Sequence, residues 1–256
     1  MNALKEKLLA GKPAIGVSVM LPFPQVVEMV GHLGFDWVLI DCEHGAISPD
    51  LVETLAMAAA AAGIVPIARP PTSSPVAITQ MLDRGVASVQ IPHVGHAAEA
   101  RRVVEAVKYA PLGSRGLAVG TRAARYGVRG SLARHVVEAN RDTLVCVQLE
   151  DTDALRDLEA IAAVEGVDVV FVGPSDLSQS LGYPGDITHP VVQDTMRMAC
   201  TRITAAGKVA GTTGTTGTAD MLRTAIGAGA GYVYVHVTTL LARASEEILG
   251  ALQPPA

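Results

Sequence analysis

Eight short runs of apolar residues, most of them rich in valine and isoleucine, alternate along this chain with longer stretches of helix-forming composition. Several runs contain almost no polar residue, which is typical of parallel strands that are covered on both faces. Most intervals between successive runs are about 20 to 30 residues long, the length of one strand–helix step. The runs are residues 14–20, 36–41, 65–69, 88–92, 143–150, 167–172, 209–213 and 232–237.

This alternation predicts an α/β protein with a parallel sheet, and eight repeats predict a closed (β/α)8 barrel, the TIM-barrel architecture. The chain has 256 residues, and a barrel of this kind typically takes about 250. No linker or low-complexity stretch interrupts the pattern, so we expect a single domain over residues 1–256.

Composition narrows the choice of partners. The formal net charge is −5 and the basic residues are scattered, so neither nucleic acid nor a membrane is expected as a partner. Cys42, Cys146 and Cys200 lie far apart without metal-pair spacing, which indicates reduced thiols in a cytoplasmic protein. Residues 1–12 have no long apolar core and do not fit a signal peptide.

One interval between strands is much longer than the others. Between residues 92 and 143 we expect a helix at 97–109, a turn-rich segment at 111–116 and an Arg-rich segment that extends to residue 141. An insertion after the fourth strand is expected at the C-terminal mouth of the barrel, where it could cover a site or meet another subunit. Arg122, Arg125 and Arg129 could either gather a substrate acid or brace an interface.

Polar residues appear abruptly where four of the expected strands end. Barrel enzymes place catalytic groups at the C-terminal ends of their strands, so these side chains are expected to converge on one rim. The residues at these ends are, in chain order, Asp41, Glu43 and His44, then Arg69, then Gln148 and Glu150, and finally Gly173, Ser175 and Asp176.

Each of these residues also has a purely structural explanation. Asp176, or Glu150 together with Asp151, could cap the helix that follows. His44 could be a histidine that only makes structural hydrogen bonds, and Arg69 could be a surface residue. A functional site is favoured by the combination of two carboxylates, a histidine–acid pair and an arginine on one rim.

The chemistry of this set is coherent. Two carboxylates with open positions suit Mg²⁺ or Mn²⁺, which keep waters and accept substrate oxygens. A 2-oxo acid can chelate such an ion, which then stabilises charge on an enolate oxygen. Arg69 can donate to a carboxylate or oxyanion, and His44 is suited to accept a proton.

The lysines bear on the reaction type. The chain has five, and none ends an expected strand, so no nucleophile for a Schiff base is evident. Metal catalysis is therefore favoured.

Asp83 is a further unusual residue. It is expected in the last turn of a helix at 76–84, where a negative charge opposes the helix dipole. The adjacent Arg84 could compensate for it, or a cation could meet it across an interface.

The chain resembles the HpcH/HpaI family of class II, metal-dependent 2-oxo-acid aldolases over nearly its whole length. Its motifs are similar to those of aldolases for 4-hydroxy-2-oxoheptanedioate and 2-keto-3-deoxy sugar acids. The motifs lie, in order, at residues 34–37, 40–44, 111–116, 148–150, 165–168, 171–178 and 240–243. Motifs of this length in this order are specific.

The resemblance implies reversible aldol cleavage of a 4-hydroxy-2-oxo acid to pyruvate and an aldehyde. The reaction would pass through a pyruvate enolate stabilised by a divalent metal ion, Mg²⁺, Mn²⁺ or Co²⁺. The resemblance also implies a homo-oligomer, typically a hexamer, in which C-terminal helices are exchanged between barrels.

The same resemblance implies a role for each residue at the strand ends. Glu150 and Asp176 would bind the metal, and His44 would be the catalytic base. Asp41 or Asp83 would raise the basicity of His44, with Asp83 reaching it from a neighbouring subunit. Arg69 would stabilise the transition state. The residues that would contact the pyruvate moiety are Gln148, Gly173, Ser175 and Asp176.

Several positions depart from the family pattern. Cys42 replaces a common glycine, and Gly45 follows His44 in place of the usual Ala-Pro. Residues 236–239 lack the acidic residue that usually precedes the Thr pair, and residues 211–217 are unusually rich in Gly and Thr. These changes fall where the aldehyde half of the substrate would bind, so they concern specificity.

Three alternative functions remain open. Decarboxylation of oxaloacetate would need the same metal enolate but not His44 as a base. Cleavage of a CoA thioester is weakened by the lack of a basic nucleotide patch. A catalytically silent barrel that serves in assembly or ligand binding is weakened by the intact polar set. Residues 227–231 are Gly-rich but precede a strand, so they do not indicate a dinucleotide loop.

Overall fold

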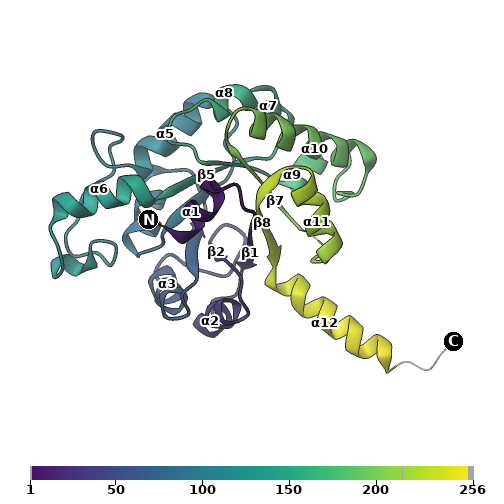
Figure 1. Cartoon of the computed structure of the whole chain (residues 1–256), viewed down its shortest axis with the longest axis horizontal. Helices are drawn as coiled ribbons and strands as arrows, with labels where there is room; N and C mark the ends of the chain where they lie inside the picture. The colour runs from purple at the N-terminus through teal and green to yellow at the C-terminus, as the bar shows by residue number, and fades with distance from the viewer. Residues whose placement is uncertain (1, 215, 253–256) are drawn as a thin grey trace.

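The structure, a computed structural model, describes residues 2–214 and 216–252. Eight parallel strands close into a barrel in chain order, with β8 paired to β1 (Figure 1). The strands are β1 (Ala14–Val19), β2 (Trp37–Asp41), β3 (Val65–Arg69), β4 (Ser88–Ile91), β5 (Leu144–Leu149), β6 (Val169–Val172), β7 (Val209–Thr213) and β8 (Ala230–His236). The predicted (β/α)8 barrel is confirmed, with every strand bound within two residues of the prediction. Thr215, in the Gly/Thr-rich segment at 211–217, lies outside the described residues.

Helices surround the barrel and connect its strands. They are α1 (Ala3–Leu9), α2 (Pro24–His32), α3 (Leu51–Ala61), α4 (Pro75–Asp83), α5 (Ala97–Val107), α6 (Leu132–Asp142), α7 (Thr152–Arg156), α8 (Leu158–Ala162), α9 (Pro174–Ser180), α10 (Pro190–Ala205), α11 (Ala219–Gly227) and α12 (Val237–Ala251), with a short 3₁₀ helix η1 (Arg125–Gly127). Several helix starts have a local cause. Before α4, the Ser74 hydroxyl accepts a hydrogen bond from the Ala77 N–H at 3.2 Å, and Pro75 occupies the first helical position.

Large aromatic side chains fill the barrel interior. Trp37 stacks on Tyr232, with ring centroids 4.1 Å apart, and Phe171 stacks on Tyr234 at 5.2 Å. Glycines on neighbouring strands leave room for them: a Cβ at Gly16 would overlap the Trp37 ring, and a Cβ at Gly211 would lie 2.9 Å from Phe171. Toward the mouth of the barrel the inward-facing residues become polar. The barrel is therefore filled by aromatic side chains below the mouth and lined by polar side chains at the mouth.

The insertion after the fourth strand lies elsewhere than predicted. We expected it at the mouth, but α5 carries the chain to the opposite end of the barrel before the insertion begins. There the Ala123 N–H donates to the carbonyl of Asp83, the last residue of α4, and the Arg122 side chain lies over Gly85. The segment continues along the outside of the helices, where the Tyr126 hydroxyl donates to Glu53 of α3 at 2.8 Å. It therefore does not cover the mouth of its own barrel.

The last helix, α12, projects away from the barrel (Figure 1). None of its residues is buried, and its exposed apolar side chains include Leu241, Ile248 and Leu249. In the part of the chain that the structure describes, no helix has the length and apolar character needed to cross a membrane.

Candidate active site

A buried ion pair joins the ends of β2 and β3. Asp41 and Arg69 are register partners, and the guanidinium grips the carboxylate with both Nε (2.9 Å) and Nη2 (2.6 Å). The backbone N–H groups of Glu43 and His44 donate to the same carboxylate, at 3.1 and 3.3 Å. Burial favours the neutral carboxyl, but these hydrogen bonds and the Arg69 charge outweigh it and lower the pKa of Asp41. Asp41 thus orients Arg69 and meets His44 through its backbone.

Glu43 lies beside this pair. Its side chain is 8% exposed, and its Oε2 lies 3.1 Å from Arg69 Nε. The single hydrogen on that nitrogen is directed to Asp41, so Glu43 Oε2 is buried close to a positive charge but accepts no hydrogen bond from any residue that the structure describes. Burial, together with repulsion from Glu150, raises the pKa of Glu43 despite the nearby Arg69.

His44 stands at the rim with its ring in reach of solvent. The side chain is 57% exposed, and Nε2 lies 3.7 Å from Glu43 Oε2. In this position the ring can exchange a proton with a molecule in the barrel mouth.

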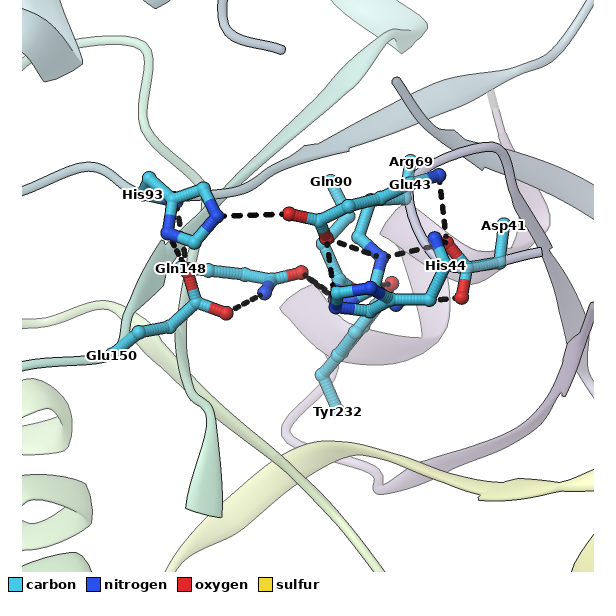
Figure 2. A network of polar contacts seen from close by, with 9 residues as sticks. All are labelled: Asp41, Glu43, His44, Arg69, Gln90, His93, Gln148, Glu150 and Tyr232. Atoms are coloured by element: carbon cyan, nitrogen blue, oxygen red, sulfur yellow. Dashed lines mark hydrogen bonds and ion pairs between the residues drawn. The ribbon is translucent and has the colours of Figure 1, made fainter. Parts of the chain in front are cut away.

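A chain of hydrogen bonds fixes Glu150 at the end of β5 (Figure 2). The Tyr232 hydroxyl donates to Gln90 at 2.9 Å, Gln90 donates to Gln148, and Gln148 Nε2 donates to Glu150 Oε1 at 2.6 Å. Glu150 is not a helix cap, because Asp151 caps α7 by accepting from the Ala154 N–H at 2.7 Å.

His93, which follows β4, contacts two of these carboxylates (Figure 2). Its Nδ1 lies 3.1 Å from Glu150 Oε2, and its Nε2 lies 3.0 Å from Glu43 Oε1. The sequence analysis did not include His93 among the site residues, although it directly follows the strand predicted at 88–92. The rule that polar residues follow strand ends would have found it if it had been applied to this strand.

His44, Arg69, Gln148 and Glu150 line one pocket of about 110 Å³ at the mouth. The described residues that line it are His44, Arg69, Gln148, Glu150, Phe171, Gly173, Pro174, Ser175, Asp176, Thr213, Tyr234 and His236. All of the predicted site residues except Asp41 and Asp83 are in this set, and Asp41 lies directly behind Arg69. The pocket lining includes no lysine, since Lys108 and Lys208 donate to backbone carbonyls near the opposite end of the barrel.

Two residues on α9 and before it shape the acidic side of the pocket. Asp176 is exposed in the first turn of α9, and its side chain makes no capping hydrogen bond, since the cap position is Gly173. A Cβ at Gly173 would lie 3.1 Å from Glu150 Cγ, so glycine gives the Glu150 side chain its space.

The far wall of the pocket was not predicted as part of the site. Thr213, Tyr234 and His236 line it, and His236 Nδ1 is buried without a hydrogen-bond partner among the described residues. Burial and the nearby Arg69 charge lower the pKa of His236. The sequence signals were the departures from the family pattern at 211–217, which contains Thr213, and at 236–239, which contains His236.

Asp83 lies outside this pocket. Its carboxylate accepts from Arg115 Nη2 at 2.7 Å, and the Arg115 guanidinium lies over the Tyr109 ring, 4.7 Å from its centroid. The cation that compensates Asp83 is therefore Arg115, and not the adjacent Arg84, which donates to the Gln80 carbonyl.

A (β/α)8 barrel with carboxylates, an arginine and a histidine around one mouth pocket is the architecture of an enzyme that can stabilise negative charge on a substrate oxygen. Comparison with known proteins identifies the family of the chain. Residues 15–239 match the family described as HpcH/HpaI aldolase/citrate lyase, and the chain belongs to that family. It is a carbon–carbon lyase.

Individual members of the family are similar to this chain over most of its length. The chain is 39% identical over 248 residues to a 4-hydroxy-2-oxo-heptane-1,7-dioate aldolase of Shigella flexneri, covering 96% of this chain and 91% of the relative. It is 41% identical over 211 residues to a pyruvate aldolase of Rhizobium etli, covering 82% of each. The crystal structure of an HpcH/HpaI aldolase/citrate lyase family protein from Burkholderia cenocepacia superposes with a TM-score of 0.92 at 31% identity, covering 99% of this chain and 100% of the other.

Proposed function

We propose that this enzyme reversibly cleaves a 4-hydroxy-2-oxo acid to pyruvate and an aldehyde through an enolate of pyruvate. The observation that carries this proposal is the single pocket that gathers Glu150, Asp176, Arg69 and His44 with no lysine in its lining. Relatives that are 39% and 41% identical are named as aldolases of this kind.

The donor groups fit a divalent cation, on which HpcH/HpaI aldolases depend. Glu150 and Asp176 would hold it, and both line the pocket. Over the described residues, no three His, Cys, Asp or Glu side chains form a cluster that could hold a metal ion by themselves. Two carboxylates with the remaining positions left to water and substrate oxygens are typical of Mg²⁺ or Mn²⁺ sites, and the family resemblance adds Co²⁺ to the candidate ions. When bound, the ion would act as a Lewis acid toward the negative charge of the enolate.

Arg69 is proposed to bind the substrate carboxylate and the developing oxyanion. Asp41 occupies its Nε and Nη2, while Nη1 lies 3.5 Å from Gln148 Oε1 at the pocket wall. The guanidinium is thus oriented before substrate arrives, and Arg69 lines the pocket. Gln148, Gly173 and Ser175 are proposed to complete the wall around the pyruvate moiety.

His44 is proposed to accept the proton of the 4-hydroxyl group during cleavage and to return it to the aldehyde oxygen during synthesis. Asp41 supports its position through the His44 backbone N–H. Asp83 lies outside the pocket of its own barrel, so we propose that it acts from a neighbouring subunit of a homo-oligomer, a hexamer by family resemblance. A cytoplasmic location is part of the same proposal.

A second candidate activity is decarboxylation of oxaloacetate to the same enolate. It is favoured by the separation of roles in the site: His44 stands 57% exposed at the rim, while Arg69, Gln148 and Glu150 are buried. Forming an enolate by loss of CO₂ requires the buried Arg69, Gln148 and Glu150 but no base.

One variant separates the two activities. His44→Ala should lower aldol cleavage, followed as pyruvate release from a 4-hydroxy-2-oxo acid, by about 100-fold or more, while oxaloacetate decarboxylation stays within a few-fold of the parent. Equal loss of both activities in a folded variant that still binds Mn²⁺ would contradict the proposed division of roles.

A further inference from the structure

His93 is placed on the rim so that its ring spans two strand ends. It follows β4, while its two ring nitrogens meet Glu150 at the end of β5 and Glu43 just after β2, at 3.1 and 3.0 Å (Figure 2). The sequence neighbour with the same side chain, His96, makes a much weaker contact, 4.0 Å from Asp157.

The backbone of His93 contributes to the same arrangement. Its φ is 56°, in the left-handed region, which is unfavourable for a residue other than glycine. In this conformation the His93 N–H donates to Glu150 Oε2 at 2.9 Å, so the backbone and the ring of His93 both contact the same carboxylate oxygen. The left-handed backbone of His93 thus occurs together with contacts of both its N–H and its ring to Glu150.

These contacts restrict how Glu150 can turn. Its Oε1 accepts from Gln148 at 2.6 Å, and its Oε2 meets His93 twice. A carboxylate has about four lone-pair directions, so the directions left for a cation are fixed by these neighbours. On the other side of the ring, His93 Nε2 contacts Glu43 Oε1 at 3.0 Å. The second oxygen of Glu43, Oε2, lies 3.1 Å from Arg69 Nε.

We propose that His93 is a positioning residue of the metal site, which holds the Glu150 carboxylate in its ligating orientation by tying it to Glu43. This inference rests on the proposed function, in which Glu150 is a ligand of the cation. It extends the site to β4, whose residues were not among the predicted ligands or catalytic groups. Partners of this kind behind metal ligands typically change metal affinity by about 10- to 100-fold when they are removed.

The test is Mn²⁺ binding to the metal-free enzyme, followed by the electron paramagnetic resonance signal of free Mn²⁺. His93→Gly removes the ring but keeps the backbone donor and the positive φ, so it isolates the side chain. We expect its Kd for Mn²⁺ to rise about 10- to 100-fold. His93→Asn, which tolerates the left-handed backbone and can donate once but is too short to span both carboxylates, should fall between the parent and His93→Gly. His96→Ala, the matched control on the same rim, should bind as the parent does.

Coupling to Glu43 distinguishes this role from a loss of local structure. If His93 acts through its tie to Glu43, then Glu43→Ala should weaken Mn²⁺ binding clearly in the parent and much less in the His93→Gly background. Equal effects of Glu43→Ala in both backgrounds would contradict the tie.

Two outcomes overturn the inference in distinguishable ways. If the parent binds Mn²⁺ in a manner that Glu150→Gln abolishes, but both His93 variants bind as tightly as the parent or more tightly, His93 has no positioning role and the proposed function stands. If the parent does not bind Mn²⁺, or binds it equally well without Glu150, the metal site proposed above fails together with the inference.

Discussion

Asp41 is a buried carboxylate that forms an ion pair with the buried guanidinium of Arg69. Its pKa is lowered in the folded protein, so it binds fewer protons there than in the unfolded chain. The resulting stability is present above the unfolded pKa, about 3.9, and is lost as the pH falls through the lower folded value. Asp41→Asn should lower the free energy of unfolding at pH 7 by about 3 kcal/mol, because it removes the carboxylate that accepts two hydrogen bonds from the buried Arg69 and leaves Glu43 as the nearby anion.

The pH dependence of the free energy of unfolding below pH 7 tests whether Asp41 contributes stability in its ionised form. Urea denaturation between pH 7 and pH 3 should show a shallower loss of stability for Asp41→Asn than for the parent. The surface variant Asp194→Asn, whose exposed partner is Arg197, should leave the curve nearly unchanged. Parallel curves for Asp41→Asn and the parent would contradict the assignment.

Glu43 has the opposite linkage. Burial and the charge of Glu150 raise its pKa, so ionised Glu43 costs stability at neutral pH, and the cost disappears as the pH falls and the group takes up a proton. Glu43→Gln should therefore be more stable than the parent at pH 7 without divalent metal, and the difference should vanish near pH 4. Thermal unfolding at both pH values measures this, and a variant that is less stable at pH 7 would exclude it.

At this scale the sequence predicted the site residues unevenly. His44, Arg69, Gln148, Glu150 and Asp176 were found because each follows an apolar run, and a parallel barrel brings all such positions to one rim. Their chemical roles stay predictions. His236 carried no signal beyond a departure from the family pattern, because its importance comes from the neighbouring strand and from burial, which no local pattern encodes.

Among the secondary-structure elements, the strands were predictable and the insertion was not. Strands β2, β5 and β6 are covered on both faces, so their sequences are nearly free of polar residues inside the barrel wall. The insertion was placed at the wrong end although the helix expected at 97–109, observed as α5 (Ala97–Val107), returns the chain to the N-terminal end of the barrel before the insertion begins. Its contacts with α4 are long-range, and a local pattern does not contain them.

Packing between strands supplies a prediction of its own. Gly16 on β1 faces Trp37 on β2 so closely that a Cβ would overlap the indole ring. Gly16→Ala should destabilise the fold by about 1–3 kcal/mol or more through overpacking. Gly227→Ala in α11, where nothing lies within 4 Å of the added methyl, should leave stability unchanged or slightly higher. Chemical denaturation of both variants tests the difference, and similar effects would contradict the packing.

For the whole molecule, the distal part of α12 is a helix with exposed apolar side chains, while Val237 and Leu240 at its start pack against the barrel. Its exposed Leu241, Ile248 and Leu249 are expected to pack against a second copy of the chain in the proposed homo-oligomer. Replacing Ile248 and Leu249 by Glu should shift the mass measured by light scattering to smaller species, whereas Glu246→Gln on the same helix should not. A parent that is already monomeric at micromolar concentration would contradict the oligomer.

The central claim is that this barrel forms an enolate of pyruvate with the help of a divalent cation. The most direct measurement is exchange of the C3 protons of pyruvate in D₂O, followed by NMR with EDTA-treated enzyme and then with added Mg²⁺, Mn²⁺ or Co²⁺. The proposed function predicts negligible exchange without metal and rapid exchange with at least one of the three ions. Folded enzyme that promotes no exchange with any of them, or exchanges equally well in EDTA, would contradict it.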